Sequence, residues 1–296
     1  MTAAPSGVDP LAGRPEGPLA GPLAGKVALV TGAGRRGGLG EAIALRLGRD
    51  GAHVVIHDRG AVEGDIAPAH GVAAADELEA TAAGLRAEGI DVSTATADLL
   101  SEAAIDAMFD RLAQERGRLD ILVNNAGIGY LFGALTEMTA DHLDAVLGVN
   151  LRAAVLATRN AARLMIAQGG GGRVVNIASQ AGKSGFAFAT AYTASKHGLI
   201  GFTRAAALEL AEHAITVNAI CPNHVTTGLG SWQNDFMSKA RGQSVDDYLA
   251  EMRQRIPLGR PGLPADTAAL AAFLCSDEAA YMTAEAINVS GGEEYH

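Results

Sequence analysis

Short apolar runs alternate along the chain with segments whose apolar residues recur at helical spacing. KVALVTG (26–32) is continuously apolar and rich in valine, which is typical of a buried strand. GEAIALRLGRDG (40–51) spaces its apolar residues three or four apart and ends on glycine, which predicts a helix. The same reading predicts strands over 26–32, 52–58, 91–98, 119–127, 173–179, 215–222 and 286–292, and helices over 40–51, 74–89, 101–117, 139–168, 190–213 and 264–275.

This alternation predicts an α/β protein with a doubly wound parallel sheet, the Rossmann fold, and helices on both faces. No linker or shift in composition interrupts residues 25–296, so we expect a single domain. Residues 1–24 are rich in proline, glycine and alanine, lack the pattern of a secretory signal, and are expected to form a disordered tail. Two segments break the alternation: a long loop at 59–73 and residues 226–262, a candidate lid over a substrate.

Composition excludes several classes of protein. Hydrophobic residues make up 48% of the chain, enough for a sizeable core. The net charge of −10 without a lysine or arginine cluster argues against a nucleic-acid partner, and no apolar run is long enough to predict a membrane partner. Cys221 and Cys275 lack CxxC spacing, so we expect no metal site and a reducing, cytoplasmic compartment.

The stretch TGAGRRGGLG (31–40) lies between the first predicted strand and the first predicted helix. In a doubly wound sheet this turn binds pyrophosphate, because glycine lets the backbone approach and the helix N-terminus attracts anions. Gly32, Gly34 and Gly37 satisfy the pattern GxGxxG. Asp58 ends the second strand, where a carboxylate binds the ribose hydroxyls of a dinucleotide. The alternative is a solvated aspartate in a turn.

YTASK places Tyr192 and Lys196 four residues apart, on one face of a predicted helix. A phenol has an ordinary pKa of about 10, and a nearby ammonium group favours the phenolate. The pair therefore predicts a tyrosine that exchanges protons near neutral pH. Ser179 ends the preceding strand, from where its hydroxyl could polarise a carbonyl oxygen. The alternatives are a helix-capping serine and a solvated lysine.

With these motifs the chain resembles the short-chain dehydrogenase/reductase family from about residue 25 to its C-terminus. Thr31, Gly32, Gly38 and Gly40 match the family pattern TGxxxGxG with two residues inserted around Arg35–Arg36. The family motif NNAG is present at 124–127, and PNHVTT (222–227) resembles the motif PGxVxT. The resemblance implies further cofactor contacts by Asp98, Leu99, Asn125, Ala126, Gly127, Val225 and Thr227.

The resemblance also implies a division of catalytic roles. Tyr192 would be the general acid/base, and Lys196 would tune it and bind the nicotinamide ribose. Ser179 would orient the reacting oxygen, and Asn150 in GVNLRAA would support a proton relay, unless it is only a core amide. Asn223 replaces the glycine of PGxVxT; because asparagine tolerates a positive φ, we expect the turn to persist.

We therefore expect an oxidoreductase that interconverts a secondary alcohol and a ketone. Asp58 would repel a 2′-phosphate, which favours NAD, whereas Arg59 and the inserted arginines keep NADP open. The alternatives are an NADP-dependent carbonyl reductase of 3-oxoacyl type and a silent dinucleotide-binding regulator. The candidate substrate contacts are Gln180, His224 and Trp232. The family usually forms homodimers or homotetramers, and NVSGGEEYH at the C-terminus is a candidate interface segment.

Overall fold

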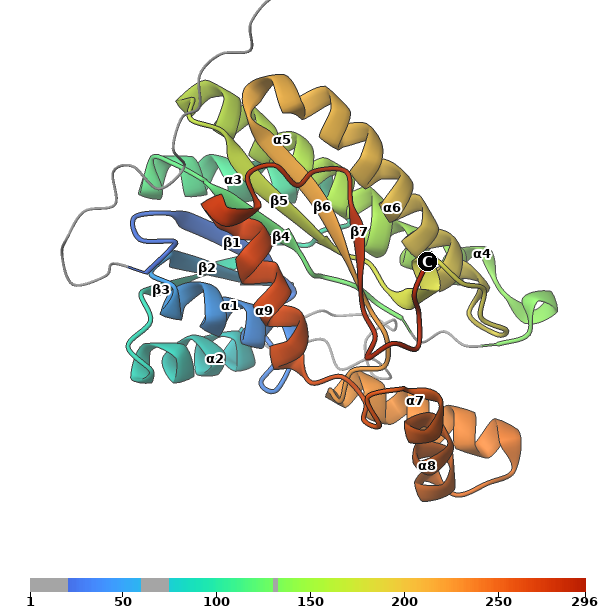
Figure 1. Cartoon of the computed structure of the whole chain (residues 1–296). Coiled ribbons are helices and arrows are strands. Elements are labelled where there is room, and N and C mark those ends of the chain that lie inside the picture. Colours follow the sequence, from blue (N-terminus) through green and yellow to red (C-terminus); the bar gives the residue numbers. More distant parts are fainter. Residues whose placement is uncertain (1–20, 60–74, 130–132) are drawn as a thin grey trace, which may run out of the picture.

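A parallel sheet forms the centre of the protein (Figure 1). The computed structural model describes residues 21–59, 75–129 and 133–296, and within these ranges the strand order is β3-β2-β1-β4-β5-β6-β7. The strands are β1 (Val27–Thr31), β2 (His53–Asp58), β3 (Val92–Thr96), β4 (Ile121–Asn124), β5 (Gly172–Ile177), β6 (Ile215–Pro222) and β7 (Ala286–Val289). The predicted doubly wound Rossmann sheet is confirmed.

Helices cover both faces of the sheet (Figure 1). One face carries α1 (Leu39–Arg49), α2 (Ala75–Ala87) and α9 (Pro264–Cys275), and the other carries α3 (Glu102–Arg116), α5 (Ala153–Gln168) and α6 (Thr190–Leu210). Side chains alternate along β1, so Ala28 and Val30 belong to one core, and Val27 and Leu29 to the other. The shorter helix α4 (Ala140–Leu147) precedes α5.

The direction of chain winding reverses between β1 and β4, which are neighbours in the sheet. The chain proceeds from β1 toward β2 and β3, and from β4 toward β5, β6 and β7. The two connections therefore diverge at the carboxyl ends of β1 and β4, which is the position where open α/β sheets bind ligands.

Buried polar side chains link the carboxyl ends of β4 and β5. Asn124 Nδ2 donates to Asn176 Oδ1 at 2.8 Å and to Thr158 Oγ1 at 3.0 Å. Asn176 Nδ2 donates in turn to Thr203 Oγ1 at 2.9 Å, on α6. These side chains are buried, so each polar group depends on its partner in place of water. The network fixes α5 and α6 relative to the central strands.

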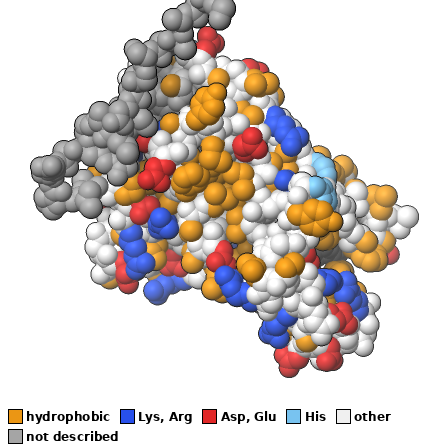
Figure 2. All heavy atoms as spheres, in the orientation of Figure 1, with side chains coloured by type: hydrophobic (Ala, Val, Ile, Leu, Met, Phe, Trp, Pro, Cys, Tyr) orange, Lys and Arg blue, Asp and Glu red, His pale blue; other side chains and the backbone are white. Residues whose placement is uncertain are grey.

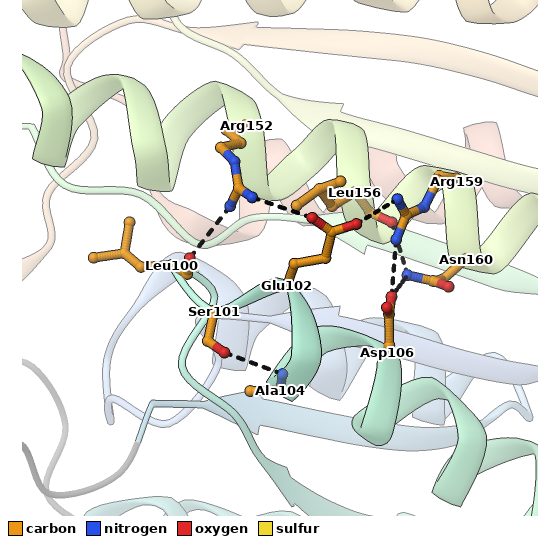
Figure 3. A network of polar contacts seen from close by, with 9 residues as sticks. All are labelled: Leu100, Ser101, Glu102, Ala104, Asp106, Arg152, Leu156, Arg159 and Asn160. Atoms are coloured by element: carbon orange, nitrogen blue, oxygen red, sulfur yellow. Dashed lines mark hydrogen bonds and ion pairs between the residues drawn. The ribbon is translucent and has the colours of Figure 1, made fainter.

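An ion-pair network joins α3 to the start of α5 (Figure 3). Glu102 contacts Arg159 at 2.7 Å and Arg152 at 3.4 Å, and Arg152 Nη1 donates to the carbonyl oxygen of Leu100 at 3.2 Å. Arg159 also pairs with Asp106 at 2.9 Å. Because the network is exposed, its ion pairs contribute little to the stability of the fold. Their main effect is to hold the loop after β3 against the segment that precedes α5.

Three details differ from the sequence prediction. The predicted helix over 139–168 is divided by a π-helical turn at Gly148–Arg152, where the helical hydrogen bonds shift register. The segment 226–262 contains two helices, α7 (Gly228–Arg241) and α8 (Val245–Arg255). Residues 21–24, assigned to the tail, pack on the domain: Leu23 is buried and its N–H donates to the carbonyl of Asp50 at 2.8 Å.

Other parts of the prediction fall outside the described structure. Residues 1–20 of the predicted tail and residues 60–73 of the predicted loop are not among the described residues. In the ranges that are described, no helix combines the length and apolar character needed to cross a bilayer. Figure 2 shows hydrophobic side chains gathered on the surface near α9 and β7. Leu263, the N-cap residue of α9, and Phe273 within α9 are exposed.

We expect Asn176→Ala to lower the free energy of unfolding by about 2–3 kcal/mol, because it leaves the amide of Asn124 and the hydroxyl of Thr203 buried without this partner. Urea denaturation measures the change. Thr94→Ala removes an exposed hydrogen bond to Glu79 and should change stability by less than about 0.5 kcal/mol. Equal losses in the two variants would contradict a special role for the buried network.

Candidate active site

A cavity of about 470 Å³ lies at the carboxyl ends of the strands, where the winding direction reverses. It brings together most of the side chains and glycines that the sequence predicted for catalysis and binding. Those that line it are Gly32, Gly38, Gly40, Asp58, Asp98, Leu99, Asn125, Ala126, Gly127, Ser179, Gln180, Tyr192, Lys196, His224, Val225 and Thr227. Gly34 and Asn150 lie behind this lining, and the side chain of Trp232 is not among the described ones.

The turn after β1 packs tightly against the NNAG segment after β4. Thr31 Oγ1 accepts hydrogen bonds from the backbone N–H groups of Asn125 and Ala126, each at 3.1 Å. Asn125 Nδ2 donates to the carbonyls of Thr31 and Gly32, each at 2.9 Å. A Cβ on Gly32 would lie 2.6 Å from Ala126 Cα, and one on Gly40 would lie 2.6 Å from Asn125 Nδ2. The two motifs can meet only because these positions are glycine.

The start of α1 faces the cavity through Gly38, Leu39 and Gly40. Its N-cap residue is Gly38, and no side chain caps the first turn. The first N–H groups of a helix have no partner within the helix, and the helix dipole favours an anion at this end. This cradle fits the pyrophosphate of a dinucleotide.

The two inserted residues extend the turn before α1. Gly37 has a φ of +68°, and Arg35 lines the cavity. Arg36 extends toward α2 instead, since a Cβ on Gly84 would lie 3.4 Å from Arg36 Nη2. The insertion therefore brings one of its two arginines, Arg35, to the cavity.

Asp58 is held at the end of β2 by the glycine turn. Its Oδ2 accepts from the N–H of Gly34 at 3.0 Å, and its Oδ1 accepts from the N–H of Arg59 at 2.8 Å. A Cβ on Gly34 would lie 2.8 Å from Asp58 Cβ, which explains the glycine at that position. The guanidinium of Arg59 pairs with Asp98 at 3.1 Å. Asp58 and Asp98 thus present two carboxylates, with Arg59 committed to the second.

Three candidate catalytic side chains meet in the middle of the cavity. Tyr192 and Lys196 come from α6, and Ser179 follows β5 and forms a hydrogen bond with the Tyr192 side chain. Lys196 Nζ lies 5.6 Å from the centroid of the Tyr192 ring and donates to the carbonyl of Ile177 at 2.8 Å. The arrangement places a phenol, a hydroxyl and an amine around one small volume.

The predicted downward shift of the Tyr192 pKa is not found. Burial raises the pKa of this phenol, and the hydrogen bond with Ser179 opposes the rise without cancelling it. Burial also lowers the pKa of Lys196 to about 8, which reduces the charge that this amine can direct at the phenol. In the protein alone, desolvation therefore outweighs the attraction that the i, i+4 spacing predicted.

Asn150 lies in the π-helical turn and is fully engaged with the backbone of Ile128. Its Oδ1 accepts from the N–H of Ile128 and its Nδ2 donates to the carbonyl of the same residue, each at 2.8 Å. Nδ2 also contacts Ser195 Oγ at 3.1 Å. A Cβ on Gly127 would lie 3.3 Å from Asn150 Oδ1 and 3.7 Å from Lys196 Nζ. The asparagine therefore supports the wall beside the lysine.

The turn after β6 persists, but for a different reason from the predicted one. Among the described non-glycine residues, a positive φ occurs at Phe188, Ala214 and Ala284, and Asn223 has none. The Asn223 side chain instead donates from Nδ2 to the carbonyl of Ser290 at 2.9 Å and to Glu293 Oε2 at 3.0 Å. Asn223 therefore holds this turn through side-chain hydrogen bonds to the C-terminal segment, and not through the positive φ that a glycine would allow.

Sequence reasoning missed several residues at the end of the cavity formed by the two lid helices. These are Phe186, Arg241, Met252, Arg255 and Glu293. The sequence predicts segment 226–262 as a candidate lid, but its cavity-facing positions depend on how α7 and α8 pack. Glu293 was assigned to a possible interface, and no local motif marks it as a cavity residue.

Comparisons with known proteins agree with this geometry. Residues 32–294 match the family described as enoyl-(acyl carrier protein) reductase. A short-chain dehydrogenase/reductase from Armillaria gallica is 38% identical over 268 residues, which cover 90% of this chain and 95% of that protein. The structure is similar to that of an actinorhodin polyketide ketoreductase variant with NADPH, with a TM-score of 0.83, 35% identity and coverage of 94% and 100% of the two chains. It is also similar to carveol dehydrogenase from Mycobacterium avium in complex with NAD, with a TM-score of 0.84, 29% identity and coverage of 92% and 99%.

The lowered pKa of Lys196 predicts a pH-dependent effect of Lys196→Met on stability. Below about pH 8 the buried ammonium opposes folding, and this cost disappears as pH approaches 10.5, where the unfolded lysine also loses its proton. We expect the variant's unfolding free energy, relative to the unmodified protein, to fall by about 2 kcal/mol between pH 7.5 and pH 10. Lys239→Met, on an exposed part of α7, is the control. Parallel stability curves for the Lys196 variant would reject the shift.

Proposed function

The chain belongs to the short-chain dehydrogenase/reductase family of NAD(P)-dependent oxidoreductases, and from this premise we propose that it interconverts a secondary alcohol and a ketone with NAD(H) as cofactor. The observation that carries the proposal is the meeting of Tyr192, Ser179 and Lys196 in one cavity with the glycine turn and Asp58. This arrangement supports hydride transfer beside a group that exchanges the hydroxyl proton.

When bound, the nicotinamide accepts or supplies the hydride. Side chains of this protein bind the oxygen of the substrate and exchange its proton. Ser179 orients it by hydrogen bonding, and Tyr192 takes its proton during oxidation or donates one during reduction. Lys196, held by the carbonyl of Ile177, would hydrogen-bond the nicotinamide ribose of the cofactor, and its protonated form would favour the phenolate. Asn150 holds the backbone of Ile128 in the wall beside Lys196 and would support a proton relay there.

Asp58 supports NAD over NADP. Its carboxylate is fixed by two backbone N–H groups and lines the cavity, so a 2′-phosphate would meet a negative charge while a 2′-hydroxyl would find an acceptor. The nearby Arg59 is paired with Asp98, which weakens its availability for a phosphate. We accordingly assign the adenosine end to Asp58, Asp98 and Leu99.

A second candidate is an NADP(H)-dependent carbonyl reductase of 3-oxoacyl type. Two observations favour it: Arg35 lines the cavity at the same end as Asp58, and a structurally similar polyketide ketoreductase is seen with NADPH. A silent dinucleotide-binding regulator is the third. Turnover of any secondary alcohol or ketone, followed by nicotinamide absorbance with each cofactor, separates the enzymes from the regulator.

We also propose that the protein forms a homodimer or homotetramer and works in the cytoplasm. Strand β7 ends the sheet, so one of its edges has no neighbouring strand in the described chain. Apolar side chains lie exposed near it (Figure 2). These features support self-association, which sedimentation velocity measures directly. Cys221 and Cys275 are buried free thiols, which supports a reducing compartment.

Tyr192→Phe should lower the rate of turnover by at least about a hundredfold, because it removes the hydroxyl that exchanges the proton. Binding of NADH, measured by its fluorescence, should persist, since the ring remains. Tyr281→Phe, at a fully exposed tyrosine outside the cavity, serves as the control. Unchanged turnover in the Tyr192 variant would remove this residue from the mechanism.

Asp58→Asn should lower the preference for NAD over NADP, expressed as the ratio of kcat/KM values, by about tenfold or more. The amide oxygen can still accept from the N–H of Gly34, but the charge that repels a 2′-phosphate is lost. Asp91→Asn removes an exposed carboxylate outside the cavity and should leave the ratio unchanged. A protein that prefers NADP before the substitution would favour the second candidate.

A further inference from the structure

Charged side chains occupy the lid end of the cavity, beyond the candidate catalytic residues. Arg241 and Arg255 line it from α7 and α8, and Glu293 lines it from the C-terminal segment. The other charged side chains of the described lining are Arg35, Asp58, Arg59, Asp98 and Lys196, which belong to the cofactor end and the centre. Without counter-charges, the two lid arginines would attract an anionic substrate to this end of the cavity.

Both lid arginines are already engaged with carboxylates of the same chain. Arg255 Nε lies 3.5 Å from Glu293 Oε1, and its side chain also hydrogen-bonds the hydroxyl of the buried Tyr248. Arg241 Nη1 lies 3.3 Å from Glu251 Oε2, with its guanidinium carbon 5.4 Å from the centroid of the Tyr248 ring. Each cation therefore has a counter-charge before any substrate arrives.

The two counter-charges differ in how firmly they are fixed. Glu251 is on the exposed side of α8, with 52% of its side chain accessible, whereas Glu293 is 17% accessible. Glu293 also accepts from Asn223 Nδ2 at 3.0 Å, and Asn223 is itself bound to the carbonyl of Ser290. Glu293 is thus held in place from the turn after β6, independently of its arginine.

We propose that Glu293 is a specificity-determining residue: its fixed carboxylate neutralises Arg255, so that the cavity selects an uncharged ketone or alcohol over an anionic one. The inference rests on the proposed function and names the substrate class for that site. An anion placed at this end would meet a carboxylate that cannot withdraw, and a like-charge contact opposes binding. The surrounding Phe186, Met237 and Met252 offer apolar surface to an uncharged group.

The test compares two ketones that differ mainly in charge: ethyl acetoacetate, which is neutral, and acetoacetate, its anionic acid. Reduction is followed by NADH absorbance, and binding by the rise in melting temperature of the NADH-bound protein. The unmodified protein should favour the ester in both readouts. In Glu293→Gln the acid-to-ester ratio of kcat/KM should rise about fivefold or more, because Arg255 loses its fixed counter-charge.

Three variants separate charge from position. Asn223→Gly cuts the hydrogen bond that anchors Glu293 but keeps its charge, so the carboxylate can withdraw and the acid-to-ester ratio should rise, but by less than in Glu293→Gln. Adding Arg255→Met to Glu293→Gln should return the ratio toward its original value. Glu88→Gln removes the carboxylate of an exposed pair with Arg49 outside the cavity, and should change nothing.

The outcomes distinguish this inference from the proposed function. If neither ketone is reduced but the ester alone stabilises the NADH complex, the reaction is wrong for this ketone and the selection for an uncharged ligand stands. The inference is overturned if the unmodified protein favours the acid, if neither ketone raises the melting temperature, or if Glu293→Gln leaves the ratio unchanged. A rise in Asn223→Gly that equals or exceeds the rise in Glu293→Gln also overturns it, because the effect would then come from the turn and not from the charge of Glu293.

Discussion

The site depends on the close contact between the turn after β1 and the segment after β4. Thr31 and Asn125 exchange hydrogen bonds across the reversal point of the sheet, and neither Gly32 nor Gly40 has room for a side chain. Without this contact the start of α1 could not face the same cavity as α6. The glycine turn and the Tyr192 side of the cavity are therefore brought together by one close approach of two backbone segments.

Much of this organisation could be predicted from the sequence, because the signals are local. The alternation of apolar runs and helical spacing gives the layers of the fold, and TGAGRRGGLG and YTASK lie at fixed positions relative to strand ends. The direction in which the Tyr192 pKa shifts could not be predicted from the sequence alone. The spacing to Lys196 is visible in the sequence, but the burial that raises the phenol pKa is a property of the packed site.

The lid end of the cavity was hidden from sequence reasoning for a related reason. Glu293 and Asn223 are 70 residues apart, and their contact exists only because β6 and β7 are neighbours in the sheet. The role of Asn223 was also hidden, because it too depends on a contact between segments that are far apart in the sequence. Its place in the PNHVTT turn suggested a conformational role, whereas its side chain bonds to Ser290 and Glu293. Long-range polar contacts of this kind leave no periodic pattern.

The π-helical turn at Gly148–Arg152 has a consequence for chain length. It accommodates an additional residue between α4 and α5, and each residue turns an α-helix by about 100°. Deleting one residue here would convert the turn into ordinary α-helix and keep the faces of α4 and α5, whereas deleting one residue from the regular part of α5 would rotate the helix beyond it by that angle. The alanine face formed by Ala153, Ala157 and Ala161 would leave the sheet only in the second case, so the packing of α5 tolerates the loss of a residue at the π-helical turn more readily than a loss within the helix.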